Sequence, residues 1–309
     1  MKVKISAVVP IFNEEGNIEI LYDRLKSTFQ KIDRSFEIIF INDGSYDNSK
    51  KLLLKIAKKD KRVKIITFSR NFGHMSAINA GLSYSSGRKV AVMDADMQDP
   101  PSVIEKMYKK SLEGYDVVYG IKKKRKEGFL RKFLFKLFYK ILDKISSLRM
   151  PLDAGTFSIL DRKIVDIIVD LPERNKYFSG LRAWAGFKQT GVVYERGKRH
   201  KGKEASFSRL FKLAMDGIIS FSFVPLKIAS ILGFIFSAFS FVLIIVLFVL
   251  KFFVNLGIVG WTSTISTVLF IGGIQLITLG IIGEYLARIY DEVKRRPEYI
   301  IEEKINFKK

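Results

Sequence analysis

Clusters of carboxylate and amide side chains are the residues in this chain whose types and spacing could do chemistry. The most informative cluster is the segment DADMQD at 94–99, in which Asp94 and Asp96 lie two residues apart. Carboxylates at this spacing can place oxygens around one hard cation such as Mg²⁺ or Mn²⁺, and Gln98 could add a carbonyl oxygen. The alternative is a helix N-terminus, where carboxylates favour the helix dipole without any metal.

Two further polar clusters lie at 10–15 and 42–47. In the second, Asn-Asp-Gly-Ser is a turn sequence, and turn chemistry by itself explains these residue types. The functional alternative is that the Asp43 carboxylate accepts a hydrogen bond from the imide of a nucleobase. The VPIFNEE segment at 9–15 ends an apolar run with polar groups that could meet the same base and its ribose. Asp47 is placed to cap a following helix.

Alternating strands and helices must position these clusters, and the apolar pattern predicts them. Short apolar runs predict strands at 4–10, 37–41, 63–68, 89–93 and 116–119. Helical patterns lie between them, at about 14–30, 49–59, 75–84 and 100–112. This rhythm is typical of an α/β fold with a mostly parallel sheet and helices on both faces. Ligands bind such sheets at the carboxyl ends of the strands, where all three polar clusters fall.

The composition excludes several classes of protein. Of the 309 residues, 48% are hydrophobic and 27% are charged, which is too apolar for a disordered chain and too charged for a multi-span transporter. The chain has no Cys, so disulfides, thiolate metal sites and thiol nucleophiles are excluded. With 53 Lys and Arg against 31 Asp and Glu, the net charge of +22 points to an anionic partner, either nucleic acid or a membrane surface.

Two long uncharged runs near the C-terminus predict membrane-spanning helices. Residues 228–250 carry no charge, and at about 1.5 Å per residue they would measure roughly 35 Å, enough for a bilayer core of about 30 Å. A second uncharged run at 252–283 contains a predicted span at about 261–283. The alternative is a pair of buried helices in a soluble core, although apolar runs of this length are rare in soluble folds.

The predicted organisation is a cytoplasmic domain at 1–220, a two-helix transmembrane hairpin at 221–290 and a cytoplasmic tail at 291–309. Basic residues flank the uncharged runs, and the positive-inside rule places the large domain and both termini in the cytoplasm. The chain is therefore expected to be a multi-pass protein of the plasma membrane. Small residues in the spans would let helices approach closely, and we expect a homo-oligomer.

A basic segment follows the fifth predicted strand. Apolar residues recur at helical spacing over about 128–147, and Lys136, Lys140 and Lys144 lie four apart on another face. Such a helix suits a membrane interface, although an ordinary domain helix with a solvated lysine face has the same pattern. Anionic lipids would account for the positive charge, and we expect no nucleic-acid partner because no nucleic-acid-binding motif accompanies it.

Longer segments carry a resemblance to a known family. They are VVPIFNEE at 8–15, INDGSYDNS at 41–49, RNFGHMSAINAGL at 70–82, DADMQDPP at 94–101, DAGTFSILDRK at 153–163, YERGKR at 194–199 and GIIGEYLARIYDEVKRRPEYII at 280–301. Together they resemble glycosyltransferase family 2, with its Rossmann-like GT-A fold. The closer resemblance is to the polyprenyl-phosphate glycosyltransferases, which include dolichol-phosphate mannose synthases and bactoprenol glucosyltransferases.

The resemblance implies transfer of a sugar from a nucleotide-sugar, with uridine as the expected nucleoside, to polyprenyl (undecaprenyl) phosphate for cell-envelope glycan modification. It assigns nucleoside contacts to Pro10, Phe12, Glu14 and Asp43. It assigns the metal and the donor diphosphate to Asp94, Asp96 and Gln98, and the reaction centre to Asp153. It assigns the acceptor phosphate to Lys122, Arg125, Arg131 and Arg199, and a part in shaping the donor pocket to His74.

Some positions depart from the family pattern. Thr156 and Ser158 stand where the family often has an acidic residue and an Arg, and Lys122 stands where it usually has Arg. A processive polysaccharide synthase of the same fold would carry a Gln-x-x-Arg-Trp motif, which the sequence 180–184 lacks. A second alternative is a non-catalytic membrane protein that binds lipid phosphate and serves as a scaffold for a flippase, although the intact aspartates argue against it.

Overall fold

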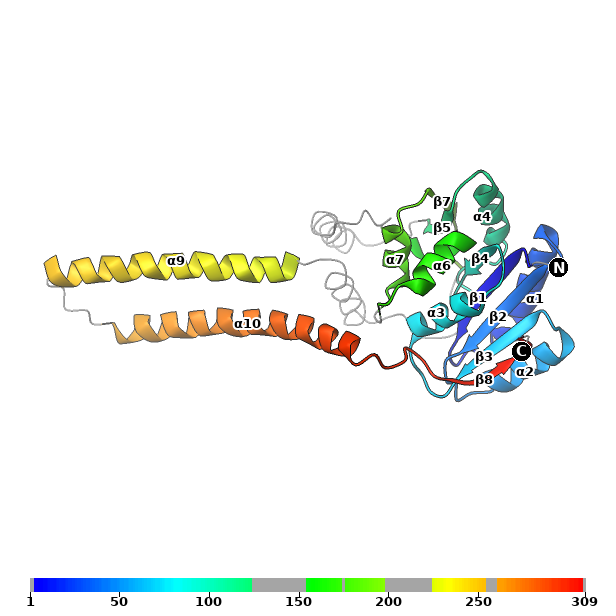
Figure 1. Cartoon of the computed structure of the whole chain (residues 1–309), viewed down its shortest axis with the longest axis horizontal. Coiled ribbons are helices and arrows are strands. Elements are labelled where there is room, and N and C mark those ends of the chain that lie inside the picture. The colour runs from blue at the N-terminus through cyan, green and yellow to red at the C-terminus, as the bar shows by residue number, and fades with distance from the viewer. Residues whose placement is uncertain (1–2, 124–153, 174–175, 198–223, 254–259, 308–309) are drawn as a thin grey trace. The chain divides into compact units, whose positions relative to one another are not determined.

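The computed structural model describes residues 3–123, 154–173, 176–197, 224–253 and 260–307. The chain forms two compact units, Met1–Gly217 together with Pro297–Lys309, and Ile218–Arg296. The first unit carries the sheet, and the second contains long helices (Figure 1). The predicted interfacial helix at 128–147 lies outside the described residues.

The described part of the first unit is built on a mixed sheet of eight strands in the order β7-β5-β6-β4-β1-β2-β3-β8. The strands are β1 Ile5–Ile11, β2 Phe36–Asn42, β3 Val63–Phe68, β4 Lys89–Val92, β5 Val117–Lys122, β6 Ala154–Asp161, β7 Gln189–Tyr194 and β8 Ile301–Ile305. Strands β1 to β4 pair in parallel, as do β5 and β7. In contrast, β6 runs antiparallel to β4 and β5, and β8 runs antiparallel to β3.

Helices pack on both faces of this sheet (Figure 1). One group is α1 Ile18–Ile32, α2 Ser49–Lys59 and α4 Val103–Leu112, and the other is α3 His74–Tyr84, α6 Arg162–Asp170 and α7 Phe178–Trp184. Successive side chains of β1 point to opposite faces of the sheet. Ala7 and Val9 join the core that contains Leu21 of α1, whereas Val8 faces α3. A Cβ on Gly81 of α3 would lie 2.2 Å from Val8 Cγ1, so glycine permits this close packing.

The predicted α/β fold is confirmed, and the five predicted strands are present with small shifts at their ends. The helix predicted at 49–59 has the same bounds in the structure. The sheet is less parallel than predicted, because β6, β7 and β8 were not foreseen and two of them are antiparallel. Pairing partners of this kind lie far apart in the sequence, so local patterns could not reveal them.

The C-terminal segment was predicted as a tail, but Ile301–Ile305 forms the edge strand β8. Just before this strand, Tyr299 stacks on Phe68 of β3 with ring centroids 4.9 Å apart. Just after it, Asn306 donates to two backbone carbonyl oxygens of the α2–β3 region, both at 2.8 Å. The strand was missed because IEEKI is short and charged, and edge strands commonly carry charges that discourage pairing with other chains.

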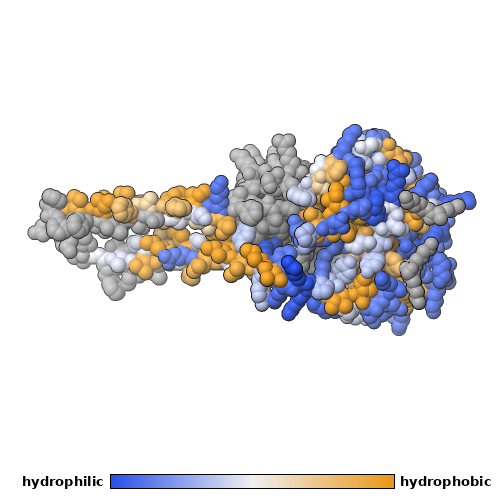
Figure 2. All heavy atoms as spheres, viewed as in Figure 1, coloured by the Kyte–Doolittle hydropathy of each residue, from blue (hydrophilic) through white to orange (hydrophobic). Residues whose placement is uncertain are grey.

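The second unit contains two long helices, α9 Val224–Phe253 and α10 Trp261–Val293. They contact each other, for example through an edge-to-face pair of Phe236 and Phe270 with ring centroids 5.5 Å apart. Many large apolar side chains are exposed along both helices, as the orange surface in Figure 2 shows. Within the described residues, one segment, Phe270–Val293, is long and apolar enough to cross a membrane by length and composition. The hairpin of two spans stays a prediction.

Candidate active site

The loops that follow β1 and β2 are joined to each other at the carboxyl edge of the sheet. The Asn13 amide donates to Ser45 Oγ at 3.0 Å, and the Asn13 side-chain oxygen accepts from the Tyr46 amide at 3.0 Å. Asn13 has a φ of 55°, a left-handed conformation that Asn adopts more readily than most residues. Asp47 accepts from the Glu15 amide at 3.1 Å and from the Ser49 amide, the first of α2, at 2.9 Å. The N-cap residue of α2 is Asn48, so Asp47, which was predicted to cap this helix, binds the helix start from one residue before the capping position.

Asp43 follows β2 directly and is 2% exposed. Its Oδ1 accepts from the Phe72 amide at 2.7 Å, and its Oδ2 accepts from the Gly73 amide at 3.0 Å. Burial raises the pKa of Asp43 above its ordinary value, although the two amide hydrogen bonds and the nearby His74 oppose that rise. The next residue, Gly44, has a φ of 66°, and a Cβ there would lie 2.5 Å from the backbone that precedes α3. Glycine is therefore required for the turn to bring Asp43 against α3.

Asp94 lies just beyond β4 and is held by side chains from two other elements. His74 Nε2, from the first turn of α3, lies 3.2 Å from Asp94 Oδ1. Thr156 Oγ1, from β6, donates to the same oxygen at 3.2 Å. Burial alone would raise the pKa of Asp94, but His74, Thr156 and the charge of Lys122 outweigh burial and lower that pKa. The Asp94 carboxylate is therefore ionised at neutral pH.

Asp96 and Asp99, the other two carboxylates of the 94–99 segment, differ in their exposure to solvent. The Gln98 amide donates to Asp96 Oδ1 at 3.1 Å, and Asp96 is partly exposed, as Asp94 is. Asp99 is 2% exposed, and the Tyr194 hydroxyl donates to its Oδ1 at 2.5 Å. Burial raises the pKa of Asp99 above its ordinary value. Asp99 thus joins the loop to β7, whereas Asp94 and Asp96 remain accessible to a ligand.

The two accessible carboxylates fit a divalent cation that is shared with a ligand. Within the described ranges, no group of three or more His, Cys, Asp or Glu side chains is arranged to hold a metal ion. Mg²⁺ sites commonly use one or two carboxylates and complete their coordination with water and phosphate oxygens. Asp94 and Asp96 lie on one loop and supply that donor set. The residues therefore suit a metal whose coordination a phosphorylated ligand completes.

The predicted nucleoside residues lie along the same edge. Pro10 is buried near the end of β1, and Glu14 accepts from Asn17 Nδ2 at 2.6 Å. Phe12 meets Tyr46 edge-to-face with ring centroids 5.3 Å apart, and the two residues are 37% and 81% exposed. Exposed aromatic rings form a suitable surface for a planar base.

The predicted acceptor residues are described only in part. Lys122 ends β5 beside the start of β6, since a Cβ on Gly155 would lie 3.2 Å from Lys122 Nζ. Ser158 is buried in β6, and its hydroxyl donates to the Thr156 carbonyl oxygen at 2.9 Å. Four other predicted site residues, Asp153, Arg125, Arg131 and Arg199, lie outside the described residues.

Sequence reasoning assigned no role to Arg182, which the structure places close to this region. Arg182 belongs to α7, is 1% exposed, and donates to the Gly155 carbonyl oxygen at 3.0 Å. Burial lowers the pKa of Arg182 to about 10, and its guanidinium carbon lies 5.3 Å from the centroid of the Tyr119 ring. The contact of Thr156 with Asp94 was also missed. Both contacts join elements that are distant in the sequence, so no local motif could have revealed them.

Comparison with known proteins places these features in context. Residues 6–168 match the family described as glycosyl transferase family 2. The uncharacterized glycosyltransferase YkcC of Bacillus subtilis is 44% identical over 302 residues, which cover 97% of this chain and 94% of that protein. The SfII prophage-derived bactoprenol glucosyl transferase of Shigella flexneri is 37% identical over 301 residues, which cover 97% of each chain. A solved structure of glucosyl-3-phosphoglycerate synthase from Mycobacterium tuberculosis is 19% identical, with a TM-score of 0.47 over 70% of this chain and 78% of that one.

Proposed function

The chain belongs to glycosyltransferase family 2, and on that premise we propose that it moves a sugar from a uridine nucleotide-sugar to a polyprenyl phosphate at the membrane. A relative that matches over nearly the whole chain is named a bactoprenol glucosyl transferase, which supports a polyprenyl phosphate as the acceptor class. The product would be a polyprenyl-phosphate-linked monosaccharide for modification of a cell-envelope glycan.

The donor nucleoside would bind at the joined loops after β1 and β2. Phe12 and Tyr46 offer exposed aromatic surface after β1 and β2, and the Asp43 carboxylate, directly after β2, offers acceptor atoms. Each carboxylate oxygen can accept more than one hydrogen bond, so the contacts of Asp43 with the backbone before α3 still permit a contact with a base. Pro10 and Glu14 complete the proposed nucleoside contacts.

The donor diphosphate would lie beside Asp94 and Asp96, which would hold Mg²⁺ or Mn²⁺, with Gln98 as a further candidate ligand. When bound, such an ion would neutralise charge on the leaving diphosphate. The lowered pKa of Asp94 supports this role, because a carboxylate must be ionised to bind a metal.

The acceptor phosphate needs little activation, because its second pKa of about 6 leaves it ionised at neutral pH. The chain must instead overcome repulsion between two anionic substrates. Lys122 lies close enough to Asp94 to influence its pKa, and it would supply positive charge to the acceptor side. By resemblance we assign Arg125, Arg131 and Arg199 the same task, and Asp153 the orientation of the reacting groups. In-line attack would invert the anomeric carbon.

Membrane attachment of the proposed enzyme is supported by the second unit. Phe270–Val293 is long and apolar enough to span a bilayer, and α9 exposes large apolar side chains such as Phe234 and Phe241. We propose a two-span hairpin in the plasma membrane, with the catalytic domain and both termini cytoplasmic. Basic residues would face anionic lipids, and the assembly would be a homo-oligomer.

The observation that carries the proposal is the position of Asp43, Asp94 and Asp96 beyond the carboxyl ends of β2 and β4, which flank β1. The test is sugar transfer by the full-length protein in lipid nanodiscs, supplied with undecaprenyl phosphate and a panel of labelled nucleotide-sugars. We expect one labelled sugar per lipid, an anomeric configuration opposite to that of the donor, and dependence on added Mg²⁺ or Mn²⁺.

Other results of this assay would support the rival functions. A ladder of products with several sugars would indicate a processive synthase. Absence of transfer from every donor, together with retained binding of the lipid phosphate, would indicate a non-catalytic scaffold. Full activity of both Asp94→Asn and Asp96→Asn would show that the assigned metal site is wrong.

A further inference from the structure

Three consecutive residues at the start of α3 contact carboxylates that belong to two different strands. The amides of Phe72 and Gly73 donate to Asp43, which follows β2. The next side chain, His74, lies with Nε2 3.2 Å from Asp94 Oδ1, beyond β4. Because β2 and β4 lie on opposite sides of β1, this short segment spans the carboxyl edge of the sheet. The position of one carboxylate is therefore tied to the position of the other.

The Asp94 carboxylate is held from two sides on one of its oxygens. His74 approaches Oδ1 from α3, and the Thr156 hydroxyl donates to Oδ1 from β6. Among the residues that the structure describes, no donor to Oδ2 is found. A carboxylate otherwise rotates over a broad range about its terminal torsion. Two donors on Oδ1 restrict that rotation and present Oδ2 to a ligand.

The identity of residue 74 is not explained by the helix that it begins. A positively charged side chain in the first turn of a helix opposes the helix dipole. The contact with Asp94 offers a specific reason for histidine at this position. The imidazole ring of His74 carries a nitrogen, Nε2, far enough from the backbone to reach the Asp94 carboxylate. The side chain of His74 is 43% exposed, so it is not required to fill the core.

We propose that His74 is a positioning residue of the transfer reaction, which together with Thr156 aims Asp94 Oδ2 at the donor diphosphate and its divalent cation. This inference rests on the proposed function and names how one of its carboxylates is oriented. Residues that hydrogen-bond to metal ligands commonly affect metal affinity by about 10- to 100-fold. His74 would act through Asp94, without touching the sugar or the acceptor.

The test measures binding without turnover. Full-length wild-type protein, His74→Ala, His74→Gln and Thr156→Val are titrated with MnCl₂ at a fixed concentration of UDP, and bound UDP is measured. We expect His74→Ala to raise the Mn²⁺ concentration for half-maximal UDP binding by about tenfold or more. His74→Gln keeps a donor near the position of Nε2, so we expect it to stay within about threefold of wild type. Thr156→Val should show a smaller increase than His74→Ala.

The matched control is Ser76→Ala, two residues further along the same helix. The Ser76 hydroxyl donates to the Phe72 carbonyl oxygen at 3.2 Å and has no contact with Asp94 in the described structure. Ser76→Ala should leave the Mn²⁺ dependence unchanged. Thermal melting of every variant separates an effect on Mn²⁺-dependent UDP binding from unfolding. If His74 had only a structural role, His74→Gln would not be expected to restore the Mn²⁺ dependence of UDP binding.

Two results would overturn the inference. One is a Mn²⁺ dependence of His74→Ala equal to that of Ser76→Ala. The other is an equal loss in His74→Gln and His74→Ala. If wild-type protein binds neither UDP nor any other nucleoside diphosphate in the presence of Mn²⁺, the proposed function itself fails, and the role of His74 fails with it. The two kinds of failure are thus distinguished by the wild-type titration.

Discussion

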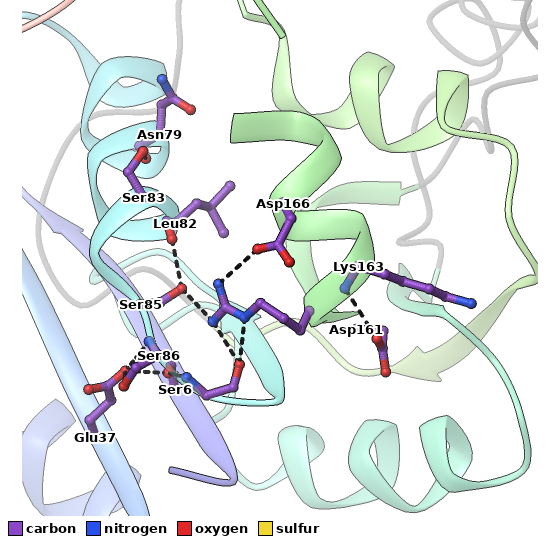
Figure 3. A network of polar contacts seen from close by, with 12 residues as sticks. Ser6, Glu37, Asn79, Leu82, Ser83, Ser85, Ser86, Asp161, Lys163 and Asp166 are labelled. Atoms are coloured by element: carbon purple, nitrogen blue, oxygen red, sulfur yellow. Dashed lines mark hydrogen bonds and ion pairs between the residues drawn. The ribbon is translucent and has the colours of Figure 1, made fainter. Parts of the chain in front are cut away.

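Charged side chains differ in their surroundings between the amino ends of the central strands, here called the amino edge, and the carboxyl ends, the carboxyl edge. At the amino edge, Glu37 is 2% exposed, and its carboxylate accepts from Ser6 Oγ at 2.6 Å and from the Ser86 amide at 2.7 Å (Figure 3). Lys64 Nζ lies 2.6 Å from the other carboxylate oxygen. Burial would raise the pKa of Glu37, but Lys64, Ser6 and Ser86 outweigh it and lower that pKa. Donors of the chain itself satisfy this buried charge.

Arg162 joins α6 to the same amino edge. Its guanidinium donates to the Gly87 carbonyl oxygen at 2.7 Å and 3.0 Å, and to Ser85 Oγ at 3.0 Å. Its Nη1 also lies 3.5 Å from Asp166 Oδ1. These contacts connect α6 to the turn that precedes β4, so the edge is closed by polar groups that have partners.

The carboxyl edge differs because two of its carboxylates, Asp94 and Asp96, are only partly enclosed. Asp94 is held on one oxygen, and Asp96 is partly exposed. A carboxylate enclosed by its own chain stabilises the fold, whereas one that is oriented and accessible can bind a ligand. The stability of the domain and its proposed activity therefore depend on different ends of the strands, and substitutions at each end should affect only one of them.

The largest effect is expected at the carboxyl edge. Asp94→Asn and Asp96→Asn should each lower the rate of sugar transfer by about 10²-fold or more, because each removes a carboxylate that would hold the cation that neutralises charge on the leaving diphosphate. Their melting temperatures should stay close to wild type, since these side chains are partly exposed. Initial rates and thermal melts measure the two properties. Two results would contradict this expectation: a variant with the wild-type rate of sugar transfer, or a variant whose main defect is a lowered melting temperature.

The converse result is expected at the amino edge. Glu37→Ala leaves Lys64 without its ion-pair partner and Ser6 without its acceptor, and we expect the free energy of unfolding to fall by about 3–5 kcal/mol. The KM for the donor should not change in the protein that remains folded. Glu37→Gln keeps the acceptor oxygen and serves as the milder control. A large change in KM with unchanged stability would show that the amino edge takes part in binding.

A smaller, pH-dependent effect is expected from Asp60, just before β3. Arg62 Nη2 at 2.7 Å and the Tyr22 hydroxyl at 3.0 Å contact its carboxylate, and the hydrogen bond from Arg62 leads in lowering its pKa from 3.8 to about 2. Because the folded pKa is the lower one, the stabilisation is present above about pH 4 and is lost as the pH falls toward 2. The shift corresponds to about 2 kcal/mol.

Denaturant unfolding at several pH values measures this contribution. Wild-type protein should lose it between about pH 4 and pH 2, whereas Asp60→Asn should lack this part of the pH dependence. The rate of sugar transfer at neutral pH should be the same in both proteins. An identical pH dependence of stability in wild type and Asp60→Asn would show that Asp60 does not carry the effect.

Some parts of the candidate active site could be predicted from the sequence because they depend on neighbours along the chain. Asp43, Asp94 and Asp96 each follow an apolar run, and the carboxyl ends of parallel strands meet at one edge. The turn at Asp43 needs Gly44, and a turn of this kind has a recognisable sequence. These features were predicted correctly, although their chemical roles were not determined by the pattern.

Other parts depend on partners that are distant in the sequence. The contact of Thr156 with Asp94 exists because β6 runs antiparallel beside β4, and no local signal specifies that direction. Strand β8 pairs with β3, although more than half of the chain separates the two strands in the sequence. The short, charged sequence of β8 was therefore interpreted as a tail. Arg182 is buried against Gly155, a contact that charge alone would not suggest.

Sequence alone therefore determined the α/β class, the positions of the first five strands along the chain, the carboxylate clusters and the long apolar runs. These are properties of hydrophobic periodicity and turn chemistry, which act over a few residues. Only the tertiary structure decided which oxygen of Asp94 is held, that Asp43 is bound by the start of α3, and that the C-terminus returns to the sheet. Such contacts depend on the pairing of distant segments, whose free energy comes from the packing of the whole domain.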